Sequence, residues 1–445
     1  MKLIECVPNF SEGRNQDVID QITAEISSVS NVKLLDVDPG KDTNRTVVTF
    51  AGNPDNVIEA AFLAISKASE LIDMSKHEGA HPRMGATDVC PLIPIKGVSV
   101  EECIEYSHKL AQKVAQKLKI PIFMYEKSAL SESRQNLAKI RQGEYEGMSD
   151  KLKLKEWKPD YGPNKLNIKS GVTGIGVREF LIAYNINLNT SDKKIASDIA
   201  LDIREAGRAK RDKGGKIIRD KNGIMMKIPG SLKFVKAVGW FLEEYNIAQV
   251  SMNLINYKKT SIHKVFEEVR KQAQKRGLRV TGSELVGLIP LDSLLDAGKY
   301  YLNEQNKSSG VSNNQLIHIA VKSMGLDEMY PFNNNEKIID YMIDDSEKLI
   351  DQTISNFIDE VSSDSPAPGG GSVSALAGSL SASLISMVAN LSHDKKQFTD
   401  KVKINSIACN AQKLKNDFLG LIDRDTIAFD ELMSSFRLPK KNDQE

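Results

Sequence analysis

One stretch of this sequence joins a histidine-containing loop to an apolar strand, and it reads His77-Glu78-Gly79-Ala80-His81-Pro82-Arg83-Met84-Gly85-Ala86-Thr87-Asp88. It holds two of the six histidines of the chain. The apolar run at residues 89–95 follows at once, and its prolines, Pro91 and Pro94, predict a strand at a sheet edge or with a bulge. Histidines on a Gly/Pro-rich loop that leads into a strand are typical of a functional site, because loops on a rigid scaffold commonly carry chemistry.

Three interpretations of the loop compete. His77-Glu78-x-x-His81 has the letters of the H-E-x-x-H zinc signature, which predicts a zinc hydrolase but works only on a helix, where both histidines share one face. Gly79 inside the motif and Pro82 after it argue against a helix, since proline moves the preceding residue out of the α region. The second interpretation is a histidine general acid and base, because the ordinary pKa of histidine lies near neutrality. The third interpretation is a loop histidine held by structural hydrogen bonds, and residues 77–81 taken alone favour this one.

Length and composition predict several globular domains without a global charge. The chain has 445 residues, which at ~150 residues per domain suggests about three domains. Its 60 basic and 59 acidic side chains give a net charge of +1, so we expect no nucleic-acid or membrane partner. We see no run of about eighteen apolar residues, no signal peptide and no CxxC spacing among the four cysteines. These features predict a cytoplasmic protein with reduced thiols and no metal.

The pattern of strands and helices predicts two similar units. Residues 3–125 read β-α-β-β-α-β-α-β. In the second half, a strand at 247–257 and a helix at 261–276 precede Glu284-Leu285-Val286-Gly287-Leu288-Ile289-Pro290-Leu291, which echoes Asp88-Val89-Cys90-Pro91-Leu92-Ile93-Pro94-Ile95. We therefore expect two α/β units of split β-α-β type, with a ligand groove between them and the histidines on one side only.

The remaining segments have a different texture. Residues 126–177 read as a polar connector with a glycine-rich end, and residues 216–227 as a hairpin around Asn222-Gly223. Beyond residue 331 the pattern is helical, with expected helices at 338–363, 372–391 and 399–436, the second capped by Gly371 or Ser372. We predict domains at 1–177, 178–330 and 331–445.

The motifs also resemble a known family. Leu3-Ile4-Glu5-Cys6-Val7-Pro8-Asn9-Phe10-Ser11-Glu12-Gly13, Leu34-Leu35-Asp36-Val37-Asp38 and the histidine loop resemble glutamate formiminotransferase over residues 1 to about 330. The tail, with Ala367-Pro368-Gly369-Gly370-Gly371-Ser372 and Leu421-Ile422-Asp423-Arg424-Asp425, resembles the start of formiminotetrahydrofolate cyclodeaminase. The resemblance implies an α+β fold: two ferredoxin-like, split β-α-β sandwich subdomains, followed by an all-α cyclodeaminase-like domain that we expect to be incomplete.

The resemblance implies a reaction and its residues. The transferase moves a formimino group from N-formimino-L-glutamate to N5 of tetrahydrofolate, its co-substrate. Its catalytic histidine falls on His81 and its supporting aspartate on Asp38, where a hydrogen bond to the other ring nitrogen would fix the tautomer. The cyclodeaminase aspartate falls on Asp425. The folate-binding segment falls on Gly162, Pro163, Asn164, Lys165, Leu166, Asn167, Ile168, Lys169, Ser170 and Gly171.

Two arginines are candidates from chemistry rather than from resemblance. Arg45 and Arg83 could hold the substrate carboxylates, because arginine pairs bidentately with carboxylates. The alternatives to the transferase are a non-catalytic folate-binding or assembly protein and, third, a zinc hydrolase built on His77, Glu78 and His81. Resemblance further implies a homodimer or larger homo-oligomer.

Overall fold

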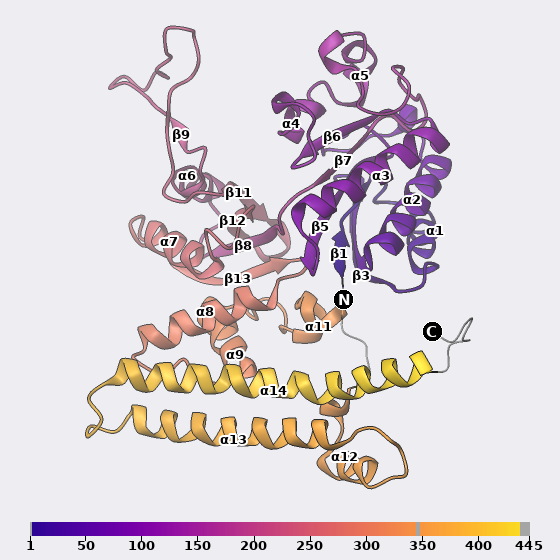
Figure 1. Cartoon of the computed structure of the whole chain (residues 1–445). Coiled ribbons are helices and arrows are strands. Elements are labelled where there is room, and N and C mark those ends of the chain that lie inside the picture. Colours follow the sequence, from indigo (N-terminus) through magenta and orange to yellow (C-terminus); the bar gives the residue numbers. More distant parts are fainter. Residues whose placement is uncertain (1, 344–347, 437–445) are drawn as a thin grey trace.

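A computed structural model describes residues 2–343 and 348–436. Two α/β subdomains come first along the chain, and a helical part with two long helices follows them (Figure 1). The mixed α and β content agrees with the α+β class predicted from the sequence.

The first subdomain begins with a β-α-β-β-α-β unit. Its elements are β1 (Leu3–Cys6), β2 (Asn9–Phe10), α1 (Gln16–Ser27), β3 (Val32–Gly40), β4 (Arg45–Gly52), α2 (Pro54–Leu71) and β5 (Thr87–Lys96). The strands lie in the order β3-β4-β1-β5, all antiparallel, and β2 continues β1 between the same neighbours. Asn15 and Asn53 cap the two helices, because the side chain of each accepts a hydrogen bond from the backbone N–H two residues later.

Strand β5 lies inside the sheet, so of the two alternatives predicted for it the edge position is wrong and the bulge is confirmed. It pairs antiparallel with β1 and β2 and parallel with β7, and its pairing shifts register beside Ile4 and Phe10. These irregularities accommodate the prolines: Pro91 has no N–H to donate, but its carbonyl accepts from the Val7 N–H at 3.2 Å.

The segment predicted as a connector is part of this subdomain. After α3 (Val100–Leu118) and β6 (Ile122–Glu126) come α4 (Leu137–Arg141), α5 (Glu144–Lys151) and β7 (Thr173–Val177). β7 inserts between β5 and β6, parallel to both. The sequence hid this strand because Gly174 and Gly176 weaken its apolar pattern; Gly176 is needed there, since a Cβ atom would lie 2.4 Å from the Tyr125 carbonyl oxygen.

The second subdomain repeats the same strand order. It contains β8 (Ile182–Leu188), α6 (Lys193–Ile203), β11 (Val235–Leu242), β12 (Ile247–Leu254), α7 (Ile262–Gln274) and β13 (Val280–Val286). The sheet order β11-β12-β8-β13 matches β3-β4-β1-β5 position by position, and all its pairs are antiparallel. Both units are therefore of the split β-α-β type that the sequence predicted.

Some elements of the second subdomain were not predicted. Strand β11 was missed, because Val235, Ala237 and Gly239 alternate with exposed residues of mixed character. Helices α8 (Leu291–Glu304) and α9 (Asn313–Met324) were also missed. The expected hairpin is a small arm in which β9 (Arg208–Ala209) pairs with β10 (Lys227–Ile228). Short 3-10 helices occupy Met74–Lys76, Glu132–Arg134, Lys155–Trp157, Glu243–Tyr245 and Leu349–Asp351.

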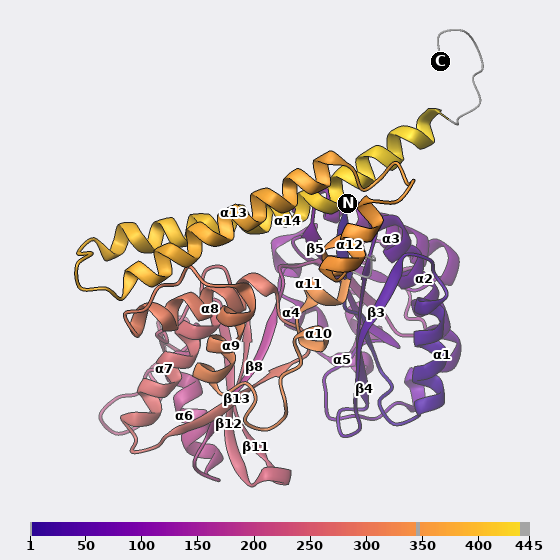
Figure 2. The same cartoon turned by 90° about the horizontal axis from the view of Figure 1, so that it is seen from below.

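The helical part departs from the single helix expected at 338–363. It holds α10 (Asn334–Lys337), α11 (Ile339–Ile343) and α12 (Ile354–Val361), while residues 344–347 of that prediction lie outside the described residues. The long helices α13 (Gly370–His393) and α14 (Lys401–Phe436) lie side by side in Figures 1 and 2. The N-cap of α13 is Gly369, so Gly371 and Ser372 lie inside the helix rather than at its cap.

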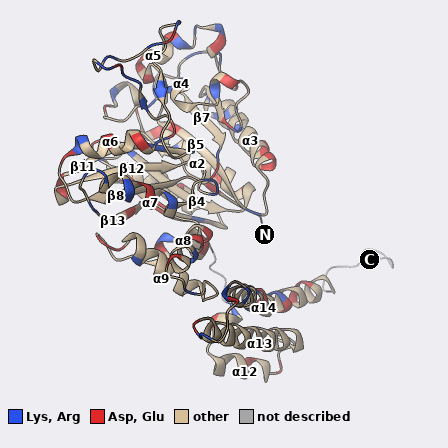
Figure 3. Cartoon of the chain, turned by 90° about the vertical axis from the view of Figure 1, so that its left-hand side faces the viewer, with Lys and Arg blue, Asp and Glu red and all other residues tan. Residues whose placement is uncertain are grey.

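Helix α13 packs through small residues. Its buried positions recur at heptad spacing: Ser372, Ala375, Ser379, Ala382, Ser386, Ala389 and His393. Its other faces expose large apolar side chains such as Leu380, Leu384 and Leu391. It carries no Lys, Arg, Asp or Glu and is tan throughout in Figure 3. Among the described helices, α13 alone is long and apolar enough to cross a membrane by length and composition. Its serines interrupt the apolar residues, so the sequence shows no unbroken apolar run there.

Two apolar cores position the groove between the subdomains. One lies between the first sheet and helices α1, α2 and α3 and contains Ile4, Cys6 and Phe50. The other fills the second subdomain and extends to Val7 and Ile93 of the first. The first sheet therefore faces its own helices on one side and the second subdomain on the other.

Candidate functional site

A cavity of about 730 Å³ lies between the two subdomains. The first subdomain contributes most of its charged walls, including Glu5, Asp36, Asp38, Arg45, His81, Arg141 and Arg178. The second contributes Lys236, Asn253, Asn256 and Gly287. A cavity with few convergent charged groups between two subdomains is the usual form of a small-molecule site.

Strand alternation explains why these polar side chains face the cavity. On β1, Ile4 and Cys6 belong to the helix-facing core, so Glu5 points to the opposite face. On β4, Val48 and Phe50 are in that core, whereas Val47 and Thr49 line the cavity. The charged residues therefore occupy the second face of an ordinary half-buried sheet.

His81 stands in the cavity in a form suited to accept a proton. Its Nδ1 lies 2.7 Å from the Pro82 carbonyl oxygen, and since a carbonyl can only accept, the ring proton sits on Nδ1 and leaves Nε2 free as a base. Burial, with Arg45 and Arg141 nearby, lowers the pKa of His81. The ring is therefore neutral at pH 7, as a general base must be.

Asp38 also lines the cavity, at the end of β3, but the described residues show no hydrogen bond between it and His81. The sequence led us to expect this bond; the structure assigns the orienting role to the Pro82 carbonyl instead. Asp36 lies two residues away on the same cavity wall, and burial followed by repulsion from Asp38 raises its pKa.

Arg45 begins β4 and reaches the same cavity. Burial lowers its pKa to about 10, which still leaves it charged at neutral pH. Its Nε is buried without a partner, and the described residues show no hydrogen bond or ion pair to its guanidinium, so its charge is available to a ligand in the cavity. Arg45 therefore stays a candidate for binding a substrate carboxylate.

Arg83 is placed differently from its predicted role. Its guanidinium donates to Glu144 at 2.9 Å and to Glu146 at 2.6 Å, and it also bonds to His77, so it does not line the cavity. Arg83 thus links the histidine loop to α5 through these bonds. The sequence could not show this, because the two glutamates lie about sixty residues further along.

Asp88 and Arg141 form an ion pair that holds the C-terminal end of the histidine loop. Neither residue was predicted as a site residue from the sequence. Asp88 is fully buried, forms a short ion pair with Arg141 and accepts from the Met84 N–H at 3.1 Å. Arg141 also lines the cavity. A lone aspartate just before an apolar run was the available signal for this pair.

The predicted folate segment, residues 162–171, does not line the cavity. It packs behind the histidine loop: the Ala86 N–H donates to the Ser170 carbonyl at 2.8 Å, and Gly85 bridges Gly171. Gly171 has a φ of 70° and no room for a Cβ atom, which lies 2.3 Å from the Met84 carbonyl oxygen. Asn164, Lys165 and Lys169 are exposed on the outer side.

The geometry does not favour the zinc interpretation. Residues 77–86 are not helical, so the two histidines do not share a helix face. His77 uses Nε2 at 2.9 Å from the Asn44 carbonyl and accepts from Arg83 with Nδ1. Within residues 2–343 and 348–436, no group of three or more His, Cys, Asp or Glu side chains is arranged to hold a metal.

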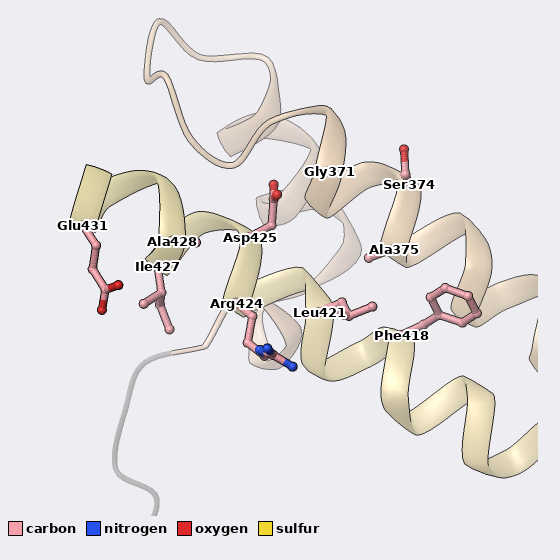
Figure 4. A pocket seen from close by; sticks show the side chains of 10 residues that line it. All are labelled: Gly371, Ser374, Ala375, Phe418, Leu421, Arg424, Asp425, Ile427, Ala428 and Glu431. Atoms are coloured by element: carbon pink, nitrogen blue, oxygen red, sulfur yellow. The ribbon is translucent and has the colours of Figure 1, made fainter. Parts of the chain in front are cut away.

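A second cavity, of about 610 Å³, lies along α13 and α14 and contains Asp425 (Figure 4). Asp425 points toward the start of α13, where the Ser372 N–H donates to its carboxylate at 3.0 Å. A Cβ at Gly371 would lie 2.2 Å from that carboxylate, so a larger residue there would displace Asp425 from its present position. Arg424 and Glu431 also line this cavity, which therefore combines a carboxylate at a helix N-terminus with both signs of charge.

Comparison with known proteins covers the whole chain. The family model of the formiminotransferase domain, N-terminal subdomain, matches residues 3–178, that of the formiminotransferase domain matches 183–344, and that of formiminotransferase-cyclodeaminase matches 353–445. Formimidoyltransferase-cyclodeaminase of Mus musculus is 45% identical over 100% of this chain and 80% of its own length. Glutamate formimidoyltransferase of Streptococcus pyogenes serotype M1 is 45% identical over 68% of this chain and 95% of its own.

The match at residues 353–445 bears on one expectation from the sequence. We expected an incomplete helical domain, and the family model recognises a cyclodeaminase domain in these residues, while the chain as a whole covers 80% of the length of the Mus musculus relative. The chain therefore belongs to the formimidoyltransferase-cyclodeaminase family of transferases, with both formiminotransferase subdomains and the cyclodeaminase domain.

Proposed function

We propose that this chain transfers the formimino group of N-formimino-L-glutamate to N5 of tetrahydrofolate and releases glutamate. The observation that carries the proposal is the neutral His81, whose Nε2 has no partner among the described residues and which lines the cavity near Arg45, with Asp38 on the wall of the same cavity. The similarity to glutamate formimidoyltransferase supports the choice of reaction.

The geometry supports a proton-shuttle mechanism. His81 Nε2 takes the N5 proton as the N5 lone pair attacks the amidine carbon, and an N5–C bond forms. The protonated imidazole then returns the proton to the glutamate nitrogen as the C–N bond to glutamate breaks. The same ring serves as base and then as acid, which requires a pKa near or below neutrality.

Arg45 and Asp38 assist this transfer in the proposal. Arg45 has a free, buried donor and holds a carboxylate of formiminoglutamate, where bidentate pairing orients it. Asp38 faces the cavity at the end of β3 and stabilises the imidazolium through space. The predicted contact of residues 162–171 with folate stays part of the proposal, and in this chain that segment faces outward.

Glutamate release from formiminoglutamate and tetrahydrofolate tests the proposal. We expect release by the wild type and a loss of at least about 100-fold in kcat for His81→Ala, the lower range for general base catalysis. His318→Ala is the matched control, because His318 is exposed on α9. A folded wild type that binds folate but releases no glutamate would favour the folate-binding alternative. Metal dependence of the release would favour the zinc hydrolase.

The Asp425 cavity supports a second activity. We propose that it carries the cyclodeaminase step, in which the formimino-folate closes to a methenyl-folate and ammonia leaves, with Asp425 as the acid and base group. The rise in methenyl-folate absorbance in the same reaction should be lost in Asp425→Asn and kept in Asp417→Asn. Asp417 is an exposed aspartate of the same helix and serves as the control. Equal rates in both variants would exclude this role.

We also propose that the chain works as a homo-oligomer in the cytoplasm. The exposed apolar faces of α13 and α14 support association, and the four cysteines are free thiols, as in a reducing compartment. Light scattering of the purified chain and cell fractionation test these two statements. A stable monomer, or recovery outside the cytoplasmic fraction, would contradict them.

A further inference from the structure

Glu5 is a buried carboxylate that the proposed proton transfer does not use. It is 3% exposed, lies on β1 between Ile4 and Cys6, and lines the cavity. Among the described residues, no hydrogen bond or ion pair satisfies its carboxylate. A carboxylate that lines a cavity and has no protein partner among the described residues is available to a ligand in that cavity.

Arg178 is the charged group that acts on Glu5. It lies in the same cavity, and its positive charge offsets part of the burial that raises the pKa of Glu5 to about 7. Its Nη1 donates to the Glu179 carbonyl at 3.0 Å, and no ion pair within 4.0 Å joins it to Glu5 in the described part of the chain. Glu5 therefore presents its two carboxylate oxygens to the cavity as acceptors, and Arg178 presents the guanidinium N–H groups that Glu179 does not use as donors.

The sheet register sets the distance between Glu5 and the proton-transfer end. Asp38 and Asn9 pair with Val47 of β4, whereas Glu5 pairs with Ala51 of the same strand. Four residues of strand separate these rungs, which is roughly 13 Å. Phe10, next to Asn9, pairs with Thr87, where the histidine loop enters β5, so the rung of Asp38 and Asn9 marks the loop end of the cavity. With the reach of the side chains at both ends, this span fits a bicyclic ring that offers one edge to Glu5 and another to the loop end.

We propose that Glu5 and Arg178 form the recognition site for the pyrimidine edge of the pterin ring. That edge presents the 2-amino group and N3–H as adjacent donors and O4 as an acceptor. The Glu5 carboxylate accepts from the two donors, and the Arg178 guanidinium donates to O4. This inference rests on the proposed transferase function and names the cavity end that selects the folate co-substrate.

The amidine of formiminoglutamate is the competing donor pair for Glu5. Its carbon must meet N5 beside His81, at the other end of the cavity, so the amidine cannot also reach Glu5. The pterin ring can bind both ends at once, because N5 and the 2-amino edge lie on opposite parts of the bicycle. The register therefore favours the pterin.

Glu5→Gln tests this assignment, because the amide keeps the shape of the side chain but replaces one acceptor with a donor. We expect the KM for tetrahydrofolate and the Kd for 5-formyltetrahydrofolate to rise about 10- to 100-fold, the range for charge-assisted bonds. The KM for formiminoglutamate should change less than about twofold. The matched control is Glu105→Gln, an exposed glutamate of α3 on the helix-covered face of the sheet.

A ligand-side arm keeps the test independent of folding in the variant. A tetrahydrofolate analogue with a methyl group in place of the 2-amino group should bind the wild type about 10- to 100-fold more weakly and should discriminate little between wild type and Glu5→Gln. An active wild type with unchanged folate binding in Glu5→Gln, or with a raised formiminoglutamate KM instead, overturns this inference alone. A wild type that releases no glutamate overturns the proposed function and this inference with it.

Discussion

The two α/β subdomains share one strand order, and they differ in the loop that leads to the fourth strand. In the first, residues 72–86 connect α2 to β5 and carry His77 and His81. In the second, only residues 275–279 connect α7 to β13, with a single turn at Gly277. The two subdomains therefore supply the two walls of the cavity through the same fold. The longer loop of the first subdomain, which has no counterpart in the second, supplies His81 as the proposed base.

The same contrast holds for the ion pairs of the two subdomains. Asp88 in the first is fully buried with Arg141 beneath the loop. Asp198 in the second pairs with Arg276 and Arg208 on the surface, where its side chain is 43% exposed. The first subdomain thus uses a buried charge to hold its loop, and the second does not.

Substituting Asp88 or Asp198 by alanine should give the largest difference between the two subdomains, measured as the loss in free energy of unfolding. Asp88→Ala removes the fully buried partner of the half-buried Arg141 and leaves the Met84 N–H without its acceptor, so we expect the free energy of unfolding to fall by about 3–5 kcal/mol. Asp198→Ala removes a solvated pair and should cost at most about 1 kcal/mol. Urea unfolding of both variants measures the difference. Equal losses would mean that the loop is not held by its buried pair.

Substrate binding should also distinguish the two walls. Arg45→Ala removes the free guanidinium of the first subdomain, so the KM for formiminoglutamate should rise about 10- to 100-fold. Lys236→Ala removes an exposed charge of the second subdomain wall and should change it by less than about threefold. Steady-state kinetics with each substrate varied in turn gives both values. An unchanged KM in Arg45→Ala would remove that residue from the site.

The pH dependence offers a smaller but sharper comparison. Because burial, Arg45 and Arg141 lower the pKa of His81, kcat/KM should stay level at neutral pH and fall about tenfold per pH unit only below that pKa. Arg45→Met removes one of the cations, so the acid limb should move to higher pH. The limb is measured from glutamate release between pH 5 and pH 8. A limb that stays in place, or moves to lower pH, would show that Arg45 does not act on His81.

Local patterns predicted much of this molecule. The spacing of Val57, Ala60 and Ala64 predicted α2, and Pro82 correctly excluded a helix at His81. The repeat of β5 in β13 revealed the paired subdomains, because strands with the same topological role carry similar apolar runs.

Long-range contacts set the limit of prediction. The partners of Arg83 on α5, the insertion of the glycine-rich β7 and the isolation of Glu5 depend on segments that meet only in the fold. Asp38 lines the cavity, but the bond to His81 that the resemblance implied is not found among the described residues, because the Pro82 carbonyl takes that nitrogen. Sequence patterns indicated which face a side chain occupies, and tertiary packing decided its partner.

The protonation state of His81 is the claim on which the comparison of the two subdomains depends. It can be measured by nitrogen-15 NMR of the chain with labelled histidine, with His81→Ala to assign the signal among the six histidines. We predict a neutral ring at pH 7 with the proton on Nδ1 and a pKa below about 6.5. A charged ring at pH 7, or a neutral ring with the proton on Nε2, would contradict the role of His81 as the base.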